Sequence, residues 1–364
     1  MKPLIRECVR GEHGEEFTIY GEHKILTHLP SDYQGVYEVP DWVTVIGLDA
    51  IRSCAELTSV IIPQSVTMIR PGNFHFCDKL TSIIIDSANP IFDSRNNCNA
   101  VIVSVTNTMI HGCNGTIIPN GIESIEEGTF VGCSALQSLY IPASVKYIGL
   151  RFFETCPNLS SLTVDINNPV YDSRDNCNAI IQTSTNTLLC SCQAVESFVI
   201  PNNITGIGRY AFQGCRNMRS LLIPETVTSI GEYAFCNCNS LEGEIHLSNI
   251  GVLNDCVFDD CMQLSRVVVG SGISKIGRGA FCSCVNLREI VLSEGVREIG
   301  PWAFERCDSL KRIFLPSSIE SIAPDAFKGC HQVTEVYIPL GTTEHFAEFE
   351  ALQQFRWRFA ERAV

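Results

Sequence analysis

The chain repeats one short pattern of hydrophobic and polar positions. Ten cysteines mark the pattern, and seven of the nine intervals between them are 23 residues long. These frame cysteines are Cys54, Cys77, Cys133, Cys156, Cys215, Cys238, Cys261, Cys284, Cys307 and Cys330. A period of 20 to 50 residues is typical of proteins built by stacking copies of one structural unit.

Each unit carries the same frame: Ile-Pro, then Val-x-x-Ile-Gly, then Ala-Phe-x-x-Cys-x-x-Leu-x-x-Ile-x-Ile. After the cysteine the apolar residues alternate with others, as in Leu287, Ile290 and Leu292, which is the period of a β-strand. A 23-residue unit cannot close a hydrophobic core alone, so it must stack on copies of itself. The pattern therefore predicts a β-rich α/β repeat solenoid of about ten 23-residue units.

Two of the units are enlarged by inserts, near residues 86–118 and 165–200. The inserts contain NPIFDSRNNCNAVI and NPVYDSRDNCNAII, which lie 79 residues apart, so a block of two units is duplicated. Asp172, Arg174 and Asn176 alternate along the second insert. Asp and Asn favour turns by bonding their own backbone, and we interpret the segment as a turn. An ion site is the alternative, although the segment lacks the glycine and the bidentate Glu of a calcium loop.

The two ends of the chain depart from the frame. Residues 1–38 are expected to form an N-terminal segment, in which residues 17–38 are an incomplete first unit that supplies an edge strand and a cap. Repeats follow over residues 39–340. In residues 341–364, five apolar residues at helical spacing predict an amphipathic helical cap with Thr342 or Thr343 as N-cap: Phe346, Phe349, Leu352, Phe355 and Phe359. Within the repeats, an added residue after Leu241 predicts a bulge or bend near residues 242–256.

Composition narrows the classes of partner. The chain has 364 residues, 45% of them hydrophobic, and a net charge of −14. A folded acidic protein is a poor match to nucleic acid or to an anionic membrane surface. No apolar run reaches the roughly 18 residues of a membrane helix. The start, MKPLIRECVRGEHGEEF, is charged where a signal peptide needs an apolar core. The protein is thus either cytoplasmic or exported by a signal outside this chain.

Nineteen cysteines raise the question of metal or redox chemistry. The frame cysteines Cys238 and Cys284 are interpreted as small buried hydrophobes. Cys236 and Cys282 occupy a variable position two residues earlier and are expected to face outward. Zinc needs four converging ligands, and no histidine stands at a matching spacing, so we expect no metal and no cofactor. Neighbouring frame cysteines lie within the Cα range of a disulfide, but their parallel side chains favour free thiols. No catalytic motif is present.

The frame resembles a known family. IPETVTSIGEYAFCNCNSL and LPSSIESIAPDAFKGCHQV are similar to leucine-rich repeats of the BspA-like, or Treponema pallidum, type. The inserts resemble the extended repeats common in that family among gut Bacteroidetes. The resemblance implies a right-handed leucine-rich-repeat superhelix. It also implies a recognition role, because related proteins are often displayed on bacterial surfaces and implicated in adhesion to host matrix proteins such as fibronectin and fibrinogen.

The strand face is the candidate binding surface. In Leu-x-x-Ile-x-Ile the residue between the last two isoleucines must point away from the core. That outward row is Ile61, Ile84, Tyr140, Thr163, Leu222, His246, Val268, Val291, Phe314 and Tyr337. An exposed apolar row of this kind often marks a binding face, and the alternative is that these residues only stabilise the strands by cross-strand pairing.

Charged residues accompany this row. Arg266, Glu289, Arg312 and Glu335 lie two positions earlier and are expected to form a charge ladder, while Arg219, Arg288 and Lys311 lie beside it and are less balanced. The candidate ligand-binding residues are Tyr140, Arg219, Leu222, His246, Arg288, Lys311, Phe314 and Tyr337.

Three functions remain open from the sequence. The first is a non-enzymatic module that binds a protein or glycan along the strand face, as a bacterial surface adhesin would. The second is an intracellular interaction scaffold, because free thiols suit a reducing compartment. The third is a thiol or metal enzyme, which requires exposed, reactive cysteines.

Overall fold

The computed structural model describes residues 6–360. The first residues of the expected N-terminal segment, 1–5, and the last of the expected C-terminal segment, 361–364, lie outside the described residues. Residues 6–360 form a β-solenoid of about 14 turns at a spacing of about 23 residues, with little helix. The predicted repeat fold is confirmed. The chain divides into two compact units, Met1–Tyr171 and Asp172–Val364, and each is described by itself.

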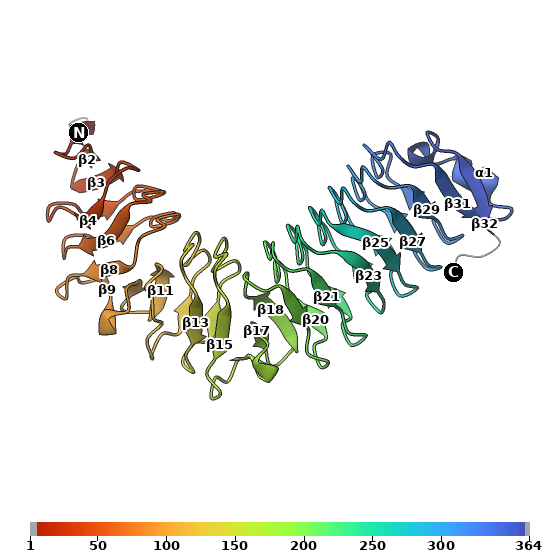
Figure 1. Cartoon of the computed structure of the whole chain (residues 1–364). Helices are drawn as coiled ribbons and strands as arrows, with labels where there is room; N and C mark the ends of the chain where they lie inside the picture. The colour runs from red at the N-terminus through yellow and green to blue at the C-terminus, as the bar shows by residue number, and fades with distance from the viewer. Residues whose placement is uncertain (1–5, 361–364) are drawn as a thin grey trace. The chain divides into compact units, whose positions relative to one another are not determined.

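The first unit begins with antiparallel strands and continues with parallel ones (Figure 1). One sheet joins β1 (Arg6–Arg10), β2 (Glu16–Tyr20), β3 (His23–His28), β5 (Val45–Ile46) and β7 (Met68–Ile69). A second sheet joins β4 (Gly35–Glu38), β6 (Leu57–Ile62) and β8 (Ser82–Ile85). The expected edge strand is β4, but residues 6–28 also form a three-stranded antiparallel meander, which the incomplete-unit interpretation did not contain.

The first insert adds strands of its own to this unit. β9 (Phe92–Asp93), β10 (Val101–Val103) and β11 (Thr108–His111) are antiparallel, and β11 then pairs in parallel with β12 (Ser124–Ile125), which pairs with β14 (Tyr147–Ile148). A short 3-10 turn, η1 (Arg95–Asn97), connects β9 to β10. β13 (Ser138–Ile141) and β15 (Ser161–Val164) form a separate parallel pair.

The second unit opens with the second insert, which repeats this plan. β17 (Ala179–Gln182) and β18 (Thr187–Ser191) form a hairpin after η2 (Arg174–Asn176). The same sheet contains β16 (Tyr171–Asp172), β20 (Gly206–Ile207) and β22 (Ser229–Ile230). β19 (Ser197–Val199) pairs in parallel with β21 (Ser220–Leu222).

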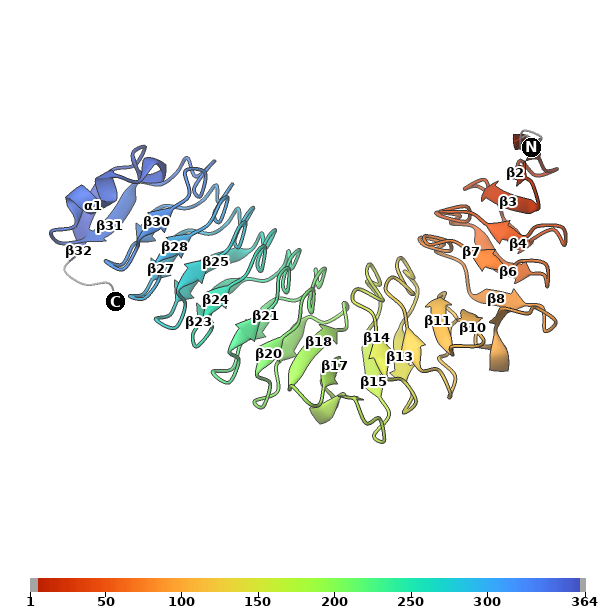
Figure 2. The ribbon, with the colours of Figure 1, turned by 180° about the vertical axis from the view of Figure 1, so that it is seen from behind.

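The rest of the second unit is two stacks of parallel strands. The longer strands are β23 (Gly243–Leu247), β25 (Leu264–Val269), β27 (Glu289–Leu292), β29 (Arg312–Phe314), β31 (Glu335–Pro339) and β32 (Trp357–Ala360). The shorter strands, visible from behind in Figure 2, are β24 (Val252–Leu253), β26 (Lys275–Ile276), β28 (Glu298–Ile299) and β30 (Ser321–Ile322). The register shifts between Gly243 and Glu244, which confirms the predicted bulge at the added residue.

The core of the second unit lies between the two stacks. Frame residues supply it, and a column of phenylalanines runs along it: Phe212, Phe235, Phe258, Phe281, Phe304 and Phe327. Successive rings are stacked with centroids 5.0 to 5.4 Å apart. The turns approach so closely that a Cβ at Gly231 would lie 2.5 Å from the backbone nitrogen of Arg209. The glycine of each Ile-Gly therefore permits stacking of the turns.

The C-terminal helix is much shorter than expected. Helix α1 covers only Thr343–Ala347, the 3-10 turn η3 covers Glu350–Leu352, and Phe359 falls in strand β32, so the helix prediction is wrong beyond Ala347. The reason is that Phe-Arg-Trp-Arg-Phe from Phe355 alternates with the period of a strand, and β32 pairs in parallel with the exposed edge of β31. Phe346 and Leu352 are nevertheless buried in the core, with Phe349 and Phe355 packed against it.

Candidate ligand-binding surface

The outward row of the second unit is continuous over its last turns. His246 pairs with Val268, Val268 with Val291, Val291 with Phe314 and Phe314 with Tyr337, each in register on parallel strands. Earlier in the unit, Leu222 of β21 is in register with Val199 of β19. β21 contacts β23 but belongs to a different sheet, so the row is interrupted between Leu222 and His246. We call these residues, from Val199 to Tyr337, the strand-face row.

Exposure varies along the strand-face row. Leu222 is 70% exposed and Val199 75%, whereas Phe314 and Tyr337 are half-buried. The expectation that Val291 faces solvent is wrong, because only 5% of it is exposed. Val268 and Phe314 stand on either side of it in the same row and shield it from water. Val291 therefore contributes to the stability of the row and offers little contact surface.

Two aromatic side chains end the row. The rings of Phe314 and Tyr337 are stacked with centroids 4.4 Å apart and an interplanar angle of 4°. The Tyr337 hydroxyl donates a hydrogen bond to Glu335 at 2.9 Å, and this bond raises the pKa of Tyr337. The hydroxyl is thus held in one orientation. Stacked, half-buried aromatic rings with a fixed polar group are the kind of rigid feature that anchors protein contacts.

The predicted charge ladder is confirmed. Arg266 is in register with Glu289, Glu289 with Arg312, and Arg312 with Glu335. Glu289 accepts from Arg266 at 2.6 Å and from Arg312 at 3.1 Å. Arg266 also pairs with Glu244, one turn earlier, and Arg358 pairs with Glu335 at 3.1 Å. Stacking of opposite charges satisfies these side chains mutually, so the ladder is mainly structural.

The three basic residues beside the ladder differ from one another. Arg219, Arg288 and Lys311 are exposed, and none forms an ion pair with another residue among those described. Backbone hydrogen bonds place Arg219 between Glu196 and Glu242 of the adjacent turns.

Arg288 and Lys311 instead lie in neighbouring turns. Lys311 N–H donates to the Arg288 carbonyl at 3.0 Å, and Ser265 and Thr334 stand in the turns on either side. Arg288 and Lys311 are thus two adjacent cations with no carboxylate in the flanking turns at this position, whereas Arg219 lies between Glu196 and Glu242.

The remaining candidates have separate surroundings. His246 is exposed, and its Nε2 lies 2.7 Å from Glu244. Tyr140 belongs to the first unit, where it is 51% exposed and donates from its hydroxyl to Asp165 at 2.5 Å. Tyr140 pairs in register with Thr163 of β15, so it belongs to the strand face of its own unit. In the second unit the structure stacks Phe314 on Tyr337 and places Arg288 and Lys311 in neighbouring turns, whereas Tyr140 belongs to the first unit.

Sequence reasoning missed two members of this surface. Val199 extends the strand-face row inside the second insert, where Phe198 and Ile200 on either side of it are buried and supply the alternating signal. Arg358 extends the charge ladder from β32. Arg358 was missed because the apolar residues of this segment were interpreted as a helix and not as a strand.

The frame cysteines form a buried ladder of thiols, as predicted. Six of these thiols donate to the carbonyl of the frame phenylalanine one turn earlier, for example Cys261 to Phe235 at 3.3 Å and Cys307 to Phe281 at 3.3 Å. Burial raises the pKa of Cys261 and Cys307 well above the ordinary value. All nineteen thiols are free. A protonated, buried thiol is a packing group and a weak hydrogen-bond donor.

The first cysteine of each Cys-x-Cys pair behaves differently from the expectation. Cys236 is buried, so the prediction that it faces outward is wrong, and Cys282 is half-buried. The intervening turn carries Asp259 at the same position, and Cys236 Sγ contacts its carboxylate at 3.9 Å. Burial raises the pKa of Asp259. Among residues 6–360, no group of three or more His, Cys, Asp or Glu side chains is arranged to hold a metal ion.

The insert turns have the structural role that we assigned to them. Arg174 donates from Nε to one Asp172 oxygen at 2.8 Å and from Nη2 to the other at 2.5 Å. Its Nη1 donates to Asn186 at 2.9 Å. Arg95 makes the matching bonds to Asp93 and Asn107 in the first insert. The aspartate oxygens that an ion would need are therefore occupied by arginine.

A leucine-rich-repeat solenoid with a parallel strand face is the class of protein that these elements define. A family model described as a BspA type leucine rich repeat region matches residues 36–115, 105–242, 182–269 and 251–351. The chain belongs to the BspA-type leucine-rich repeat family.

Solved structures share the fold. The pneumococcal vaccine antigen PcpA has a TM-score of 0.66 at 15% identity, over 98% of this chain and 99% of that one. A leucine-rich repeat protein from Eubacterium ventriosum has a TM-score of 0.58 at 16% identity, over 89% and 95%. A leucine rich cell surface protein from Faecalibacterium prausnitzii has 0.51 at 22%, over 95% and 98%. No curated protein matches this chain. In the described part of the chain, no helix has the length and apolar character to cross a membrane.

Proposed function

We propose that this chain is a non-enzymatic binding module whose strand face holds a protein partner, and that it acts as a bacterial surface adhesin for host matrix proteins. The contact residues in the second unit are Arg219, Leu222, His246, Arg288, Lys311, Phe314 and Tyr337. Tyr140 is the corresponding candidate on the strand face of the first unit. A non-enzymatic role accords with frame thiols whose raised pKa values keep them protonated at neutral pH.

One observation carries the proposal. The cationic pair Arg288 and Lys311 directly precedes strands β27 and β29, and β29 ends at Phe314, which is stacked on Tyr337. Only two residues, Arg312 and Ile313, separate Lys311 from Phe314. Aromatic anchors beside unpaired cations match a partner segment that carries both apolar and acidic side chains.

The surface location is supported by likeness to other proteins. One protein with this fold is described as a cell surface protein, and another is a vaccine antigen. The adhesin role is the part of this proposal that rests on resemblance alone, to related proteins implicated in adhesion. A glycan ligand on the same strand face is less well supported than a protein, because ionic and aromatic contacts of this spacing suit a peptide segment.

A specific observation favours a second candidate function. All nineteen thiols are free, and such a complement of unpaired cysteines suits a reducing compartment. In that case the same strand face serves an intracellular interaction scaffold. Assays of host binding separate the two functions, since the scaffold has no reason to recognise a matrix protein.

We further propose that residues 1–38 and 341–364 cap the repeat region 39–340. The antiparallel meander β1 to β3 covers one end of the first unit's sheet, and β32 adds a last strand to β31. Solenoids need such ends to stay soluble, because an exposed core layer or strand edge promotes association.

The test is binding of the purified chain to immobilised fibronectin and fibrinogen by surface plasmon resonance. Parent protein is compared with a Phe314→Ser, Tyr337→Ser variant and with a Tyr147→Ser, Ile166→Ser control, whose replaced residues are exposed in the first unit. We expect saturable binding by parent and control, and at least tenfold weaker binding by the strand-face variant.

A second arm reverses the cationic pair with Arg288→Glu and Lys311→Glu. An acidic partner should then associate more slowly, and the dependence of its association rate on salt should weaken. If the parent binds neither matrix protein, the adhesin proposal fails, and capture of intracellular partners with the same variants tests the scaffold.

A further inference from the structure

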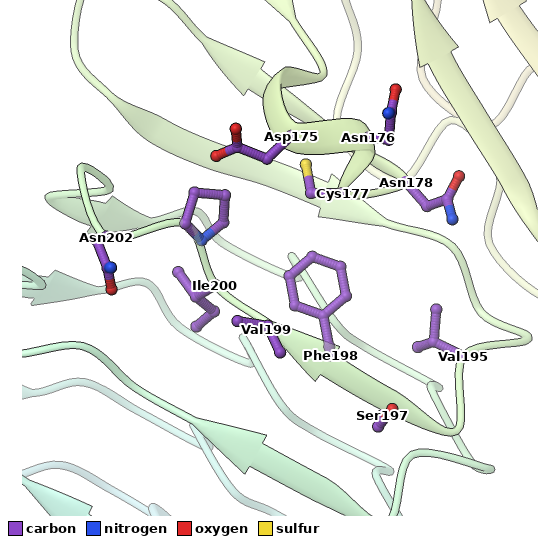
Figure 3. Close-up of a pocket in the computed structure, with 11 residues that line it drawn as sticks. Asp175, Asn176, Cys177, Asn178, Val195, Ser197, Phe198, Val199, Ile200 and Asn202 are labelled. Carbon is purple, nitrogen blue, oxygen red and sulfur yellow. The ribbon is translucent and has the colours of Figure 1, made fainter.

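The second insert borders a pocket that lies within the second unit. Its volume is about 420 Å³, which falls in the range of small-molecule sites. Figure 3 shows the η2 turn with Asp175 and Asn178 on one side, β19 and the following segment with Asn202 on the other, and the Phe198 ring between them. Val195, Ile200 and Pro201 complete an apolar floor.

The polar side chains of this pocket are not engaged elsewhere. Among the described residues, Asp175, Asn176, Asn178, Ser197 and Asn202 make no side-chain hydrogen bond or ion pair. Asp175, Asn176 and Asn202 are exposed, and Asn178 is half-buried. Several amide groups and a carboxylate thus line one cavity with their hydrogen-bonding capacity unused.

The first insert, which is the other copy of the duplicated block, provides an internal comparison. In it the equivalent asparagine makes hydrogen bonds within the insert. There Asn99 occupies the position of Asn178, and its amide donates to the Gly115 carbonyl at 3.0 Å. The Thr116 hydroxyl donates to the Asn99 carbonyl at 2.7 Å. In the second copy Ala194 and Val195 replace Gly115 and Thr116. The two hydrogen bonds that hold Asn99 in the first insert therefore have no counterpart at Asn178.

The second copy is also longer. Six residues lead from Cys113 to Pro119 in the first insert, and nine lead from Cys192 to Pro201 in the second. The additional residues form β19, which pairs with β21 and carries Ser197 to the pocket. The sequence difference between the two copies therefore coincides with the opening of a cavity and the release of its polar groups.

The chemistry of the lining selects a class of ligand. Asn side chains can both donate and accept hydrogen bonds, and the Asp175 carboxylate can accept from two adjacent hydroxyl groups of a ligand. No lysine or arginine lines the pocket, and Asp175 repels anions. The apolar floor suits the C–H face of a sugar ring. We propose that this pocket binds an uncharged pyranose unit of a glycan, at a site adjoining the strand face through Val199.

The experiment is a glycan array probed with the full chain, carrying neutral, sialylated and sulfated glycans, followed by titration with the best neutral glycan. The blocking variant is Ser197→Trp. Its matched control is Ser220→Trp, which places the same side chain at the exposed register partner of Ser197, on β21 and outside the pocket lining. A milder variant, Asp175→Asn, installs the residue that the first insert has at Asn96.

We expect binding of neutral glycans, at least tenfold weaker in Ser197→Trp, weakened several-fold in Asp175→Asn and unchanged in Ser220→Trp. Equal thermal midpoints for the variants exclude misfolding as the cause. Binding of no neutral glycan at millimolar concentration, preference for sialylated or sulfated glycans, or equal binding by Ser197→Trp and Ser220→Trp would each overturn the proposal. The array contains no matrix protein, so its outcome is independent of the strand-face assay.

Discussion

Cys284 Sγ donates a hydrogen bond of 3.2 Å to the carbonyl oxygen of Phe258, one turn earlier in the solenoid. The bond recurs along the stack, from Cys238 to Phe212 and from Cys330 to Phe304. It explains why cysteine occupies the frame position, because the thiol fills a small apolar space and still donates to a buried carbonyl. Sequence reasoning recognised only the first of these properties.

We predict that Cys284→Ala lowers the free energy of unfolding by about 1 to 2 kcal/mol, through lost packing and the lost hydrogen bond. The measurement is the urea midpoint, with Cys8→Ala as control, since Cys8 is exposed in β1 and its replacement should change stability by less than about 0.5 kcal/mol. Equal midpoints for the two variants would show that the thiol ladder contributes nothing.

Phe281 stands inside the aromatic column, stacked on Phe258 at 5.4 Å and on Phe304 at 5.3 Å. Phe281→Ala leaves a cavity between two turns and is expected to cost about 3 to 5 kcal/mol. Phe281→Leu retains most of the volume and should cost less than half as much, and Ile51 shows that one unit accepts an aliphatic residue at this position. A larger loss for leucine than for alanine in denaturant titrations contradicts this account.

His111 makes the first unit sensitive to acid. Burial, with a smaller contribution from the neighbouring charge of His75, lowers the pKa of His111 to about 3. The unfolded chain titrates near 6.5 and so binds more protons below that pH, which means that stability falls as the pH drops from about 6.5 towards 3. The expected loss attributable to His111 is roughly 2 kcal/mol at pH 5.

The control for this prediction is present in the chain. Cys190 occupies the equivalent position in the second insert, where it pairs with Ile180 as His111 pairs with Val101. His111→Cys should therefore fold and should lose stability less steeply between pH 7 and pH 5. Parallel stability profiles for parent and variant over that range are the result that rejects a role for His111.

Glu289 bridges Arg266 and Arg312 in the charge ladder, with 19% of its side chain exposed. Glu289→Gln is expected to cost about 1 kcal/mol at low salt, and less at high salt, because both arginines are partly exposed and screened. Glu320→Gln, which removes a pair with Arg297 whose side chains are about 60% exposed, is the matched control and should be near neutral. Thermal midpoints at two salt concentrations test both.

The repeated frame was sufficient to predict the fold. Leu287, Ile290 and Leu292 alternate as a strand, and Cys284 recurs at a fixed distance, so the period and the inward positions follow from the requirement that each unit bury its apolar residues on the next. The charge ladder was predictable for the same reason, because stacking in register brings every position onto its equivalent.

Departures from the repeat were decided by tertiary structure. The segment from Phe346 to Phe359 supports both a helix and a strand, and the open edge of β31 selected the strand for its last residues. Val291 and Cys236 are buried by neighbours in adjacent turns, which a one-unit pattern does not reveal. The pocket at Phe198 depends on how three additional residues pack across the insert. A repeat specifies contacts between equivalent positions, whereas contacts between unlike positions are set only when the chain is folded.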